Sequence, residues 1–341
     1  MRPRHPFVPA LVDALLELTV VGSFSRIGPS VRGRLDRWAP PSPDALAGRT
    51  VLVTGPTSGL GRQVTDEVAA LGARVVLMGR SQERLTAVHD ALVDRHGVDR
   101  FPVVVADMGS LASVRAAADE VLATESRLDV LIDNAGAIVP ERAIGPDGIE
   151  ATLATLVIGP FTLVDRLLPL LARTAGSRVI AVTSGGQYAQ PLDLDDLQSV
   201  RGGYDGTRAY ARAKRAQVSL IREWARRFGG RGIRFDSMHP GWARTRGLVD
   251  ALPTFTRLMG PLLRTPSQGT DSLVWLASAP AERISAANGS LWLDRRPRPF
   301  DRLPMTRLSI SDRRRLWDLV VGLSDAAGRV STPTTTSWRN R

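Results

Sequence analysis

The chain has 341 residues, 43% hydrophobic and 23% charged, which is typical of a folded protein that can bury a large core. It contains no cysteine, so disulfides, thiolate metal sites and cysteine nucleophiles are excluded, and its four histidines lack metal-ligand spacing. The formal net charge of +11 is concentrated in arginine-rich ends, residues 1–40 and 290–341, without a basic stripe carrying interleaved aromatics. We therefore expect no nucleic-acid partner.

Residues 1–47 form an N-terminal extension, an amphipathic segment followed by a proline-rich linker. Apolar residues recur at helical spacing over residues 8–27, but Asp13 and Glu17 make this segment too charged to span a membrane. No signal-peptide cleavage pattern is evident, so we expect a cytoplasmic protein. The segment could lie on a membrane surface, or it could equally pack against the protein or a second subunit.

After this extension, apolar strands alternate with helices of about 12 residues or more. Strands are predicted at 50–54, 73–79, 101–107, 128–136, 177–184, 232–241 and 290–294. Strands without polar alternation are typical of a parallel sheet covered on both faces. The prediction is a single α/β domain over residues 48–300, a Rossmann-type doubly wound parallel sheet of about seven strands. Residues 301–341 are a C-terminal extension with a helix and a mobile tail.

A glycine-rich turn, "TGPTSGLG", follows the first strand and contains Gly55, Gly59 and Gly61. Glycine lets backbone N–H groups approach a pyrophosphate, and the helix that starts near Leu60 points its positive end at the same charge. Glycines near a turn are often only structural. Their position between a strand and a helix favours a nucleotide site.

The end of the second strand, "MGRS", bears on the type of cofactor. An acidic residue there would bind the ribose hydroxyls of NAD, but this chain has Arg80. A guanidinium can pair with a 2′-phosphate and stack on adenine. We therefore expect NADP (NADPH) rather than NAD.

Lys214 is the only lysine in the chain, and it stands four residues after Tyr210 in "YARAK". On a helix the two side chains share one face. An adjacent ammonium lowers the pKa of a phenol, which is otherwise near 10, and it can also grip ribose hydroxyls. The pair therefore predicts acid–base catalysis, whereas Tyr204 with Arg208 has the same spacing but is the weaker candidate.

Five motifs, "TGPTSGLG", "DNAG", "VTSGG", "YARAK" and "HPGWART", occur in the order that resembles the short-chain dehydrogenase/reductase superfamily. The resemblance covers about residues 48 to 300. It is greatest to the dehydrogenase/reductase member-twelve and retinol-dehydrogenase-like subgroup.

The resemblance implies that Tyr210 is the general acid or base, that Lys214 lowers its pKa, and that Ser184 binds the substrate oxygen. The residues that would contact the nicotinamide cofactor come from every motif and include both catalytic residues of the helix. They are Gly55, Thr57, Ser58, Gly59, Leu60, Gly61, Arg80, Asp107, Met108, Asn134, Ala135, Gly136, Tyr210, Lys214, Pro240, Gly241 and Thr245. No metal is expected.

Two positions depart from the family pattern. Leu156 stands where an asparagine normally completes the proton relay behind the lysine, so another anchor is needed, Thr155 or a backbone carbonyl. Asp133 replaces the usual asparagine in "DNAG".

The expected function is NADP-dependent hydride transfer to or from a carbonyl or alcohol of a lipophilic small molecule, with residues 245–266 as an apolar lid. The alternative is a cofactor-binding but catalytically weak protein that serves as a sensor or interaction scaffold. A sugar-nucleotide epimerase shares Y-x-x-x-K, but the G-x-x-x-G-x-G turn disfavours it. The family resemblance also implies a homo-oligomer.

Overall fold

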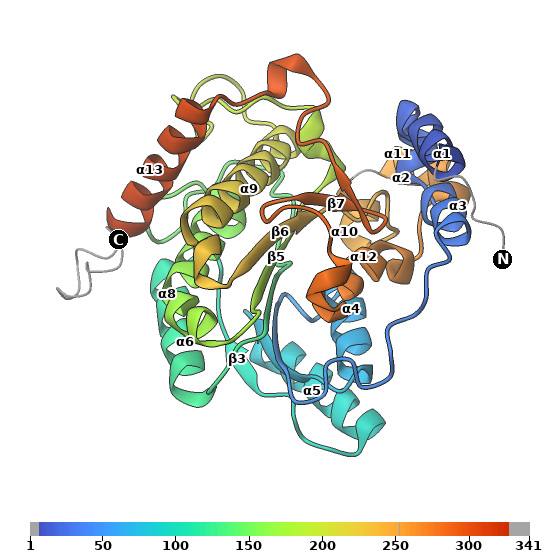
Figure 1. Ribbon diagram of the computed structural model, residues 1–341. Helices are drawn as coiled ribbons and strands as arrows, with labels where there is room; N and C mark the ends of the chain where they lie inside the picture. Colours follow the sequence, from blue (N-terminus) through green and yellow to red (C-terminus); the bar gives the residue numbers. More distant parts are fainter. Residues whose placement is uncertain (1–6, 252, 327–341) are drawn as a thin grey trace.

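An eight-stranded sheet forms the centre of the computed structural model, which describes residues 7–251 and 253–326 (Figure 1). Its strands lie in the order β3-β2-β1-β4-β5-β6-β7-β8, and every neighbouring pair is parallel except β7 and β8. The strands are β1 (Thr50–Thr54), β2 (Arg74–Gly79), β3 (Val103–Val105), β4 (Val130–Asp133), β5 (Arg178–Val182), β6 (Arg234–Met238), β7 (Leu291–Leu293) and β8 (Arg296–Arg298).

Helices cover both faces of the sheet. The α-helices are α1 (Phe7–Leu18), α2 (Val20–Phe24), α3 (Ile27–Leu35), α4 (Gly59–Ala70), α5 (Gln82–His96), α6 (Leu111–Thr124), α7 (Ala151–Leu153), α8 (Gly159–Arg173), α9 (Gly206–Phe228), α10 (Arg246–Ala251), α11 (Pro253–Met259), α12 (Pro266–Ser278) and α13 (Ile310–Ala326). A π-helical turn, η1 (Ala154–Ile158), joins α7 to α8, and the 3-10 turns are η2 (Gly185–Tyr188), η3 (Gly229–Arg231), η4 (Gly260–Leu262), η5 (Ala281–Arg283) and η6 (Pro304–Thr306).

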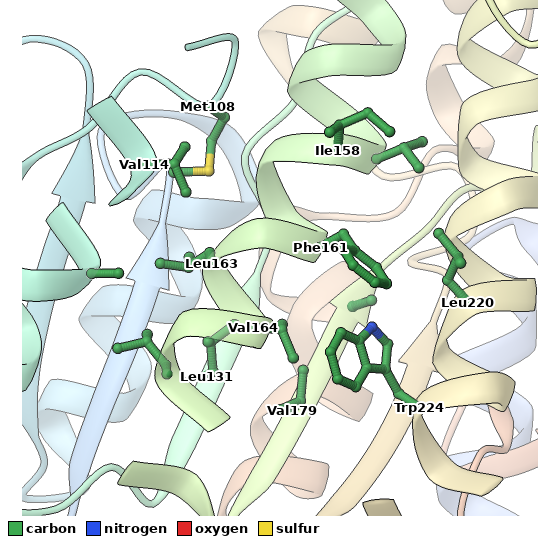
Figure 2. Close-up of a cluster of buried hydrophobic side chains, with 14 of the residues drawn as sticks. Met108, Val114, Leu131, Ile158, Phe161, Leu163, Val164, Val179, Leu220 and Trp224 are labelled. Atoms are coloured by element: carbon green, nitrogen blue, oxygen red, sulfur yellow. The ribbon is translucent and has the colours of Figure 1, made fainter. Parts of the chain in front are cut away.

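Alternate residues of the strands point into two separate hydrophobic cores, one on each face of the sheet. In β1, Leu52 packs with α6, α8, α9 and α13, whereas Val51 and Val53 pack with α4, α5 and α12. Figure 2 shows part of the first core, where Phe161 and Trp224 meet from α8 and α9 with their ring centres 5.0 Å apart. Because both faces are buried, the strands need no polar alternation, as predicted.

The predicted α/β fold, with a doubly wound parallel sheet, is confirmed. Strand β1 has the predicted bounds and β2 begins one residue later than predicted, whereas the other predicted strands are shorter at both ends: the run 128–136 yields only Val130–Asp133. Its last residues leave the sheet and pack against the glycine-rich turn. The antiparallel edge strand β8 was not predicted. Of the predicted mobile tail, residues 327–341 lie outside the described part of the chain.

The N-terminal helices α1–α3 pack beside the segment of α10 and α11 and the β7–β8 hairpin (Figure 1). Arg32 of α3 is fully buried, and its guanidinium reaches Asp13 of α1 at 2.7 Å and Asp294 at 2.5 Å. Arg264 contacts the same Asp294 carboxylate at 2.6 Å. These charges form what we call the Arg32 cluster, and it joins the first helices to a turn near the end of the sheet.

Among the described residues, the stretch Ala151–Arg173 is long and apolar enough to cross a membrane, but 78% of its apolar window is buried inside the protein. It comprises α7, η1 and α8, and it supplies much of the first core. Its apolar composition is thus accounted for by packing against the sheet.

Candidate active site

The glycine-rich turn lies where the strand order reverses, between β1 and its two neighbours β2 and β4. Gly55 and Gly59 adopt φ of +69° and +54°, the left-handed region that favours glycine. A Cβ on Gly61 would lie only 2.0 Å from the Gly55 carbonyl oxygen. These close approaches bring the start of α4 against the turn, and within the described residues Ser58 makes no side-chain cap bond there. The N–H groups of this helix end therefore fit a pyrophosphate.

Asn134 ties the end of β4 to this turn. Its side-chain amide donates to the Thr54 carbonyl at 2.9 Å and to the Gly55 carbonyl at 3.3 Å. The backbone N–H groups of Asn134 and Ala135 both donate to Thr54 Oγ1 at 2.9 Å. The side chain of Asn134 thus shapes the turn, and only its remaining atoms and the following backbone are free to line a cofactor.

The adenosine end of the predicted site lies beyond β2 and β3. Arg80 is exposed directly after β2, and no carboxylate of the described chain pairs with it. Asp107 is also exposed, and its Oδ1 accepts from the backbone N–H of Gly109 at 2.9 Å. Met108 points into the core (Figure 2), so only its backbone is placed to contact a nucleotide.

The three predicted catalytic side chains come together between β5 and α9. Ser184 follows β5, and its hydroxyl forms a hydrogen bond that lowers the pKa of Tyr210. Lys214 lies one turn after Tyr210, with its side chain 2% exposed and its Nζ 5.8 Å from the tyrosine ring centre. Lys214 Nζ donates to the Val182 carbonyl at 2.7 Å and to Gln217 Oε1 at 3.2 Å.

The pKa of Tyr210 is raised to about 12, because burial outweighs the hydrogen bond from Ser184. The lowering expected from Lys214 is therefore not found in the protein alone, where Nζ donates to the Val182 carbonyl of β5 and lies 5.8 Å from the tyrosine ring centre. Burial lowers the pKa of Lys214 to about 8, against the opposing charge of Asp133.

Tyr204, the tyrosine of the weaker pair, has a structural role. Its hydroxyl contacts Glu150 Oε1 at 3.0 Å and Thr152 Oγ1 at 2.9 Å. These contacts hold the loop before α9 against the start of α7. Tyr204 is thus engaged away from Ser184 and Lys214.

The segment after β6 completes this edge of the sheet. Gly241 has φ of +66°, and a Cβ there would lie 2.5 Å from the Phe24 carbonyl oxygen and 2.4 Å from Arg264 Nε. Thr245 lies against Gly59, 3.5 Å from where a Cβ on that glycine would be. The segment from Pro240 to Thr245 therefore spans from the catalytic side to the glycine-rich turn.

Leu156 is fully buried within the π-helical turn η1, a type of distortion that is frequent at functional sites. Its Cδ2 lies 2.4 Å from where a Cβ on Gly136 would be, and Lys214 Nζ lies 3.8 Å from the same point. Thr155 Oγ1 is directed instead toward Gly109. Lys214 Nζ donates to a backbone carbonyl, that of Val182, and the anchoring of a water relay by Thr155 or by a backbone carbonyl stays a prediction.

Two features near the site escaped the sequence analysis. Gln217 and Asp133 lie behind Lys214, and only the adjacency of β4 and α9 brings them together. Phe24, from the N-terminal extension, packs against Gly185, where a Cβ would lie 2.5 Å from its ring. The departure at "DNAG" was a signal for Asp133, but the sequence carried no signal for Phe24.

Comparison with known proteins agrees with this geometry. A family model described as short chain dehydrogenase matches residues 49–193. Dehydrogenase/reductase SDR family member 12 of Bos taurus is 38% identical over 266 residues, which cover 78% of this chain and 82% of that protein. The chain belongs to the short-chain dehydrogenase/reductase family.

Two further members of the family are similar over most of their length. Human retinol dehydrogenase 14 is 34% identical over 319 residues, covering 87% of this chain and 92% of that protein. The crystal structure of a short chain dehydrogenase from Shigella flexneri complexed with NADP superposes with a TM-score of 0.59 at 25% identity, covering 73% of this chain and 98% of that one. The present protein is accordingly a nicotinamide-dependent oxidoreductase with a small-molecule substrate, and its fold suits NADP binding.

Proposed function

We propose that this oxidoreductase transfers hydride between NADPH and the carbonyl or alcohol carbon of a lipophilic small molecule, with Tyr210, Lys214 and Ser184 as its catalytic residues. The observation that carries this proposal is the meeting of Ser184, Tyr210 and the chain's only lysine beside the glycine-rich turn. When bound, the nicotinamide ring gives or takes the hydride.

In the reductive direction the Tyr210 hydroxyl donates its proton to the substrate oxygen, and Ser184 holds that oxygen by a hydrogen bond. Lys214 has three N–H donors, two of which go to Val182 and Gln217. The third is available for the ribose of the cofactor. In the proposed mechanism the ammonium, held beside the bound cofactor, also favours the phenolate that remains after proton transfer.

The preference for NADPH rests on Arg80. Its exposed guanidinium stands at the carboxyl end of β2, where an acidic residue would repel a 2′-phosphate. A charge-assisted, bidentate contact with that phosphate would discriminate between NADPH and NADH.

A lipophilic substrate is supported by the apolar cluster that packs against Gly185, in which Phe24 and Tyr188 are buried and Trp242 is partly buried. Helix α11 extends this cluster, where Phe255 contacts Trp242 with ring centres 5.0 Å apart. The retinol dehydrogenase relative is named for a lipophilic alcohol, which fits the same substrate class.

Helix α1 supports contact with a membrane surface as part of the same proposal. Asp13 and Glu17 turn inward to the Arg32 cluster, while Leu11, Leu15 and Leu18 are 50%, 56% and 80% exposed. Such an outward apolar face fits a lipid headgroup boundary, from which a lipophilic substrate could reach the lid. A second copy of the chain in a homo-oligomer is the competing occupant of this face.

The test combines cofactor binding with turnover. Fluorescence titration should show tighter binding of NADPH than NADH, and Arg80→Gln should weaken NADPH about tenfold or more while leaving NADH unchanged. Arg95→Gln, at the far end of α5, is the matched control. With lipophilic aldehydes and ketones, Tyr210→Phe should lower kcat about 10²- to 10⁴-fold. Turnover that survives Tyr210→Phe would contradict the mechanism, and binding without any turnover would favour the sensor alternative.

A further inference from the structure

Lys214 is held by groups other than Leu156, although Leu156 lies close to its ammonium. The Val182 carbonyl fixes one N–H at the end of β5, and Gln217, one turn further along α9, fixes another. Leu156 fills the space beside Gly136 and cannot form a hydrogen bond. The orientation of the ammonium therefore depends on Gln217 and on what orients Gln217 in turn.

Asp133 of β4 orients Gln217. The Gln217 side-chain amide donates to Asp133 Oδ2 at 2.5 Å, while its Oε1 accepts from Lys214. A carboxylate only accepts hydrogen bonds and an ammonium only donates them, so the amide has one orientation that satisfies both neighbours. Gln217 thus bridges two opposite charges that both lie in the interior of the protein.

Both partners of this bridge are almost fully buried. Asp133 is 4% exposed and its Oδ1 has no hydrogen-bond partner among the described residues. Asp133 and Gln217 also border a cavity of about 30 Å³ that is otherwise lined by apolar residues of η1, α8, β5 and α9. In such surroundings a carboxylate acts on a nearby ammonium with little screening by solvent.

We infer that Gln217 and Asp133 form a positioning pair that keeps Lys214 charged and directs its remaining N–H toward the cofactor ribose, a role that the side chain at position 156 cannot fill. This inference rests on the proposed function for the use that is made of Lys214. The pair itself is a property of the folded chain.

The pKa values of the pair are consistent with this arrangement. Burial raises the pKa of Asp133 to about 6, against the charge of Lys214 and the hydrogen bond from Gln217. Burial lowers the pKa of Lys214 to about 8, and Asp133 is the charge that opposes this decrease. The other titratable group near Lys214 is Tyr210, which is neutral at pH 7 because its pKa is raised by burial.

The single lysine allows a direct test. Full-length protein labelled with ¹⁵N only at lysine Nζ, without a lysine-containing tag, gives one side-chain signal whose pKa can be followed by NMR. Asp133→Asn should lower the pKa of Lys214 by about one unit, which cuts its charged fraction at pH 7.5 about threefold. Gln217→Met, which keeps the side-chain length but removes the amide, should also lower the pKa of Lys214. Asp236→Asn, at a buried aspartate of β6 that pairs with Arg234, is the matched control and should leave the signal unchanged.

The outcomes separate the inference from the proposed function. If the variants fold and the pKa of Lys214 does not move, the positioning pair is refuted, whatever the turnover. If it moves and kcat falls most at alkaline pH, with recovery toward pH 6.5, the inference is supported. If it moves in a protein without turnover, the charge-holding role stands and the proposed function fails. Should Asp133→Asn not fold, Gln217→Met alone decides.

Discussion

At the scale of single residues, His239 is an unusual part of this edge of the sheet. It is fully buried beside Phe24, with ring centres 4.7 Å apart, and neither ring nitrogen has a hydrogen-bond partner among the described residues. Burial, together with the charge of Arg264 and neighbouring arginines, holds its pKa well below the ordinary value of 6.5. His239 is therefore neutral in the folded protein over a wide pH range.

This histidine should make the protein sensitive to acid. Below pH 6.5 the unfolded chain binds a proton at His239 that the folded chain does not, so stability is lost as the pH falls. At pH 5.5 this loss is about 1.4 kcal/mol relative to pH 7.5. His239→Leu should remove this part of the decrease in the free energy of unfolding between pH 7.5 and pH 5.5, as measured by chemical denaturation at both pH values. An equal decrease in the free energy of unfolding for the wild type and the variant would show that His239 is protonated in the folded state.

The residues that we propose to be catalytic could be selected from the sequence because the proposal depends on local spacing. Tyr210 and Lys214 are one helical turn apart, and Ser184 follows an apolar strand. Gln217 could not be recognised, because its partner Asp133 is 84 positions away and meets it only through the packing of α9 on the sheet. Met108 was placed by its motif, but its side chain is a core residue.

At the scale of elements, α1 inverts the usual placement of charge on an amphipathic helix. Its acidic side chains serve the Arg32 cluster inside the protein, and its leucines face outward. The sequence pattern predicted a helix with two faces. It could not predict which face the protein covers, because the arginine that attracts Asp13 and Glu17 belongs to α3.

The outward face of α1 should bind lipid. The protein should float with anionic phospholipid vesicles, and the triple change Leu11→Ser, Leu15→Ser and Leu18→Ser should lower vesicle partitioning about a hundredfold or more. Val98→Ser, at an exposed apolar residue in the loop before β3, is the control. If the wild type stays in the aqueous fraction and gel filtration shows that the leucine variant loses a dimer, the face belongs to a second copy instead.

At the scale of the whole molecule, the Arg32 cluster joins the N-terminal helices to the turn between β7 and β8. Burial alone would raise the pKa of Asp13, but hydrogen bonds and charges of Arg298 and Arg32 hold it well below its ordinary range. The sheet and its order followed from the alternation of strands and helices. The attachment of the extension did not, because it depends on ion pairs between residues hundreds of positions apart.

Breaking this cluster should release the extension before the sheet unfolds. Arg32→Met leaves Asp294 paired with Arg264 and Asp13 paired with Arg298. We expect the free energy that holds α1–α3 on the rest of the protein to fall by about 3 kcal/mol, with the stability of the sheet unchanged. Hydrogen exchange should then become faster over residues 7–35, and proteases should cut the linker that follows. Arg34→Met, at an exposed arginine of the same helix, should change neither. Unchanged exchange in Arg32→Met would show that apolar contacts, such as those of Phe24, hold the extension.

The pairing of Arg32 with Asp294 also sets an order of events during synthesis. The two residues are 262 positions apart, so at about 5–20 residues per second the ribosome makes Asp294 roughly 13–50 s after Arg32. Throughout that interval the nascent N-terminal helices lack the turn on which they dock, and the leucines and acids of α1 are accessible together. Chains stalled before Asp294 should therefore keep this segment open to chaperones and proteases. Docking of the first helices then marks a chain that has been made at least as far as Asp294.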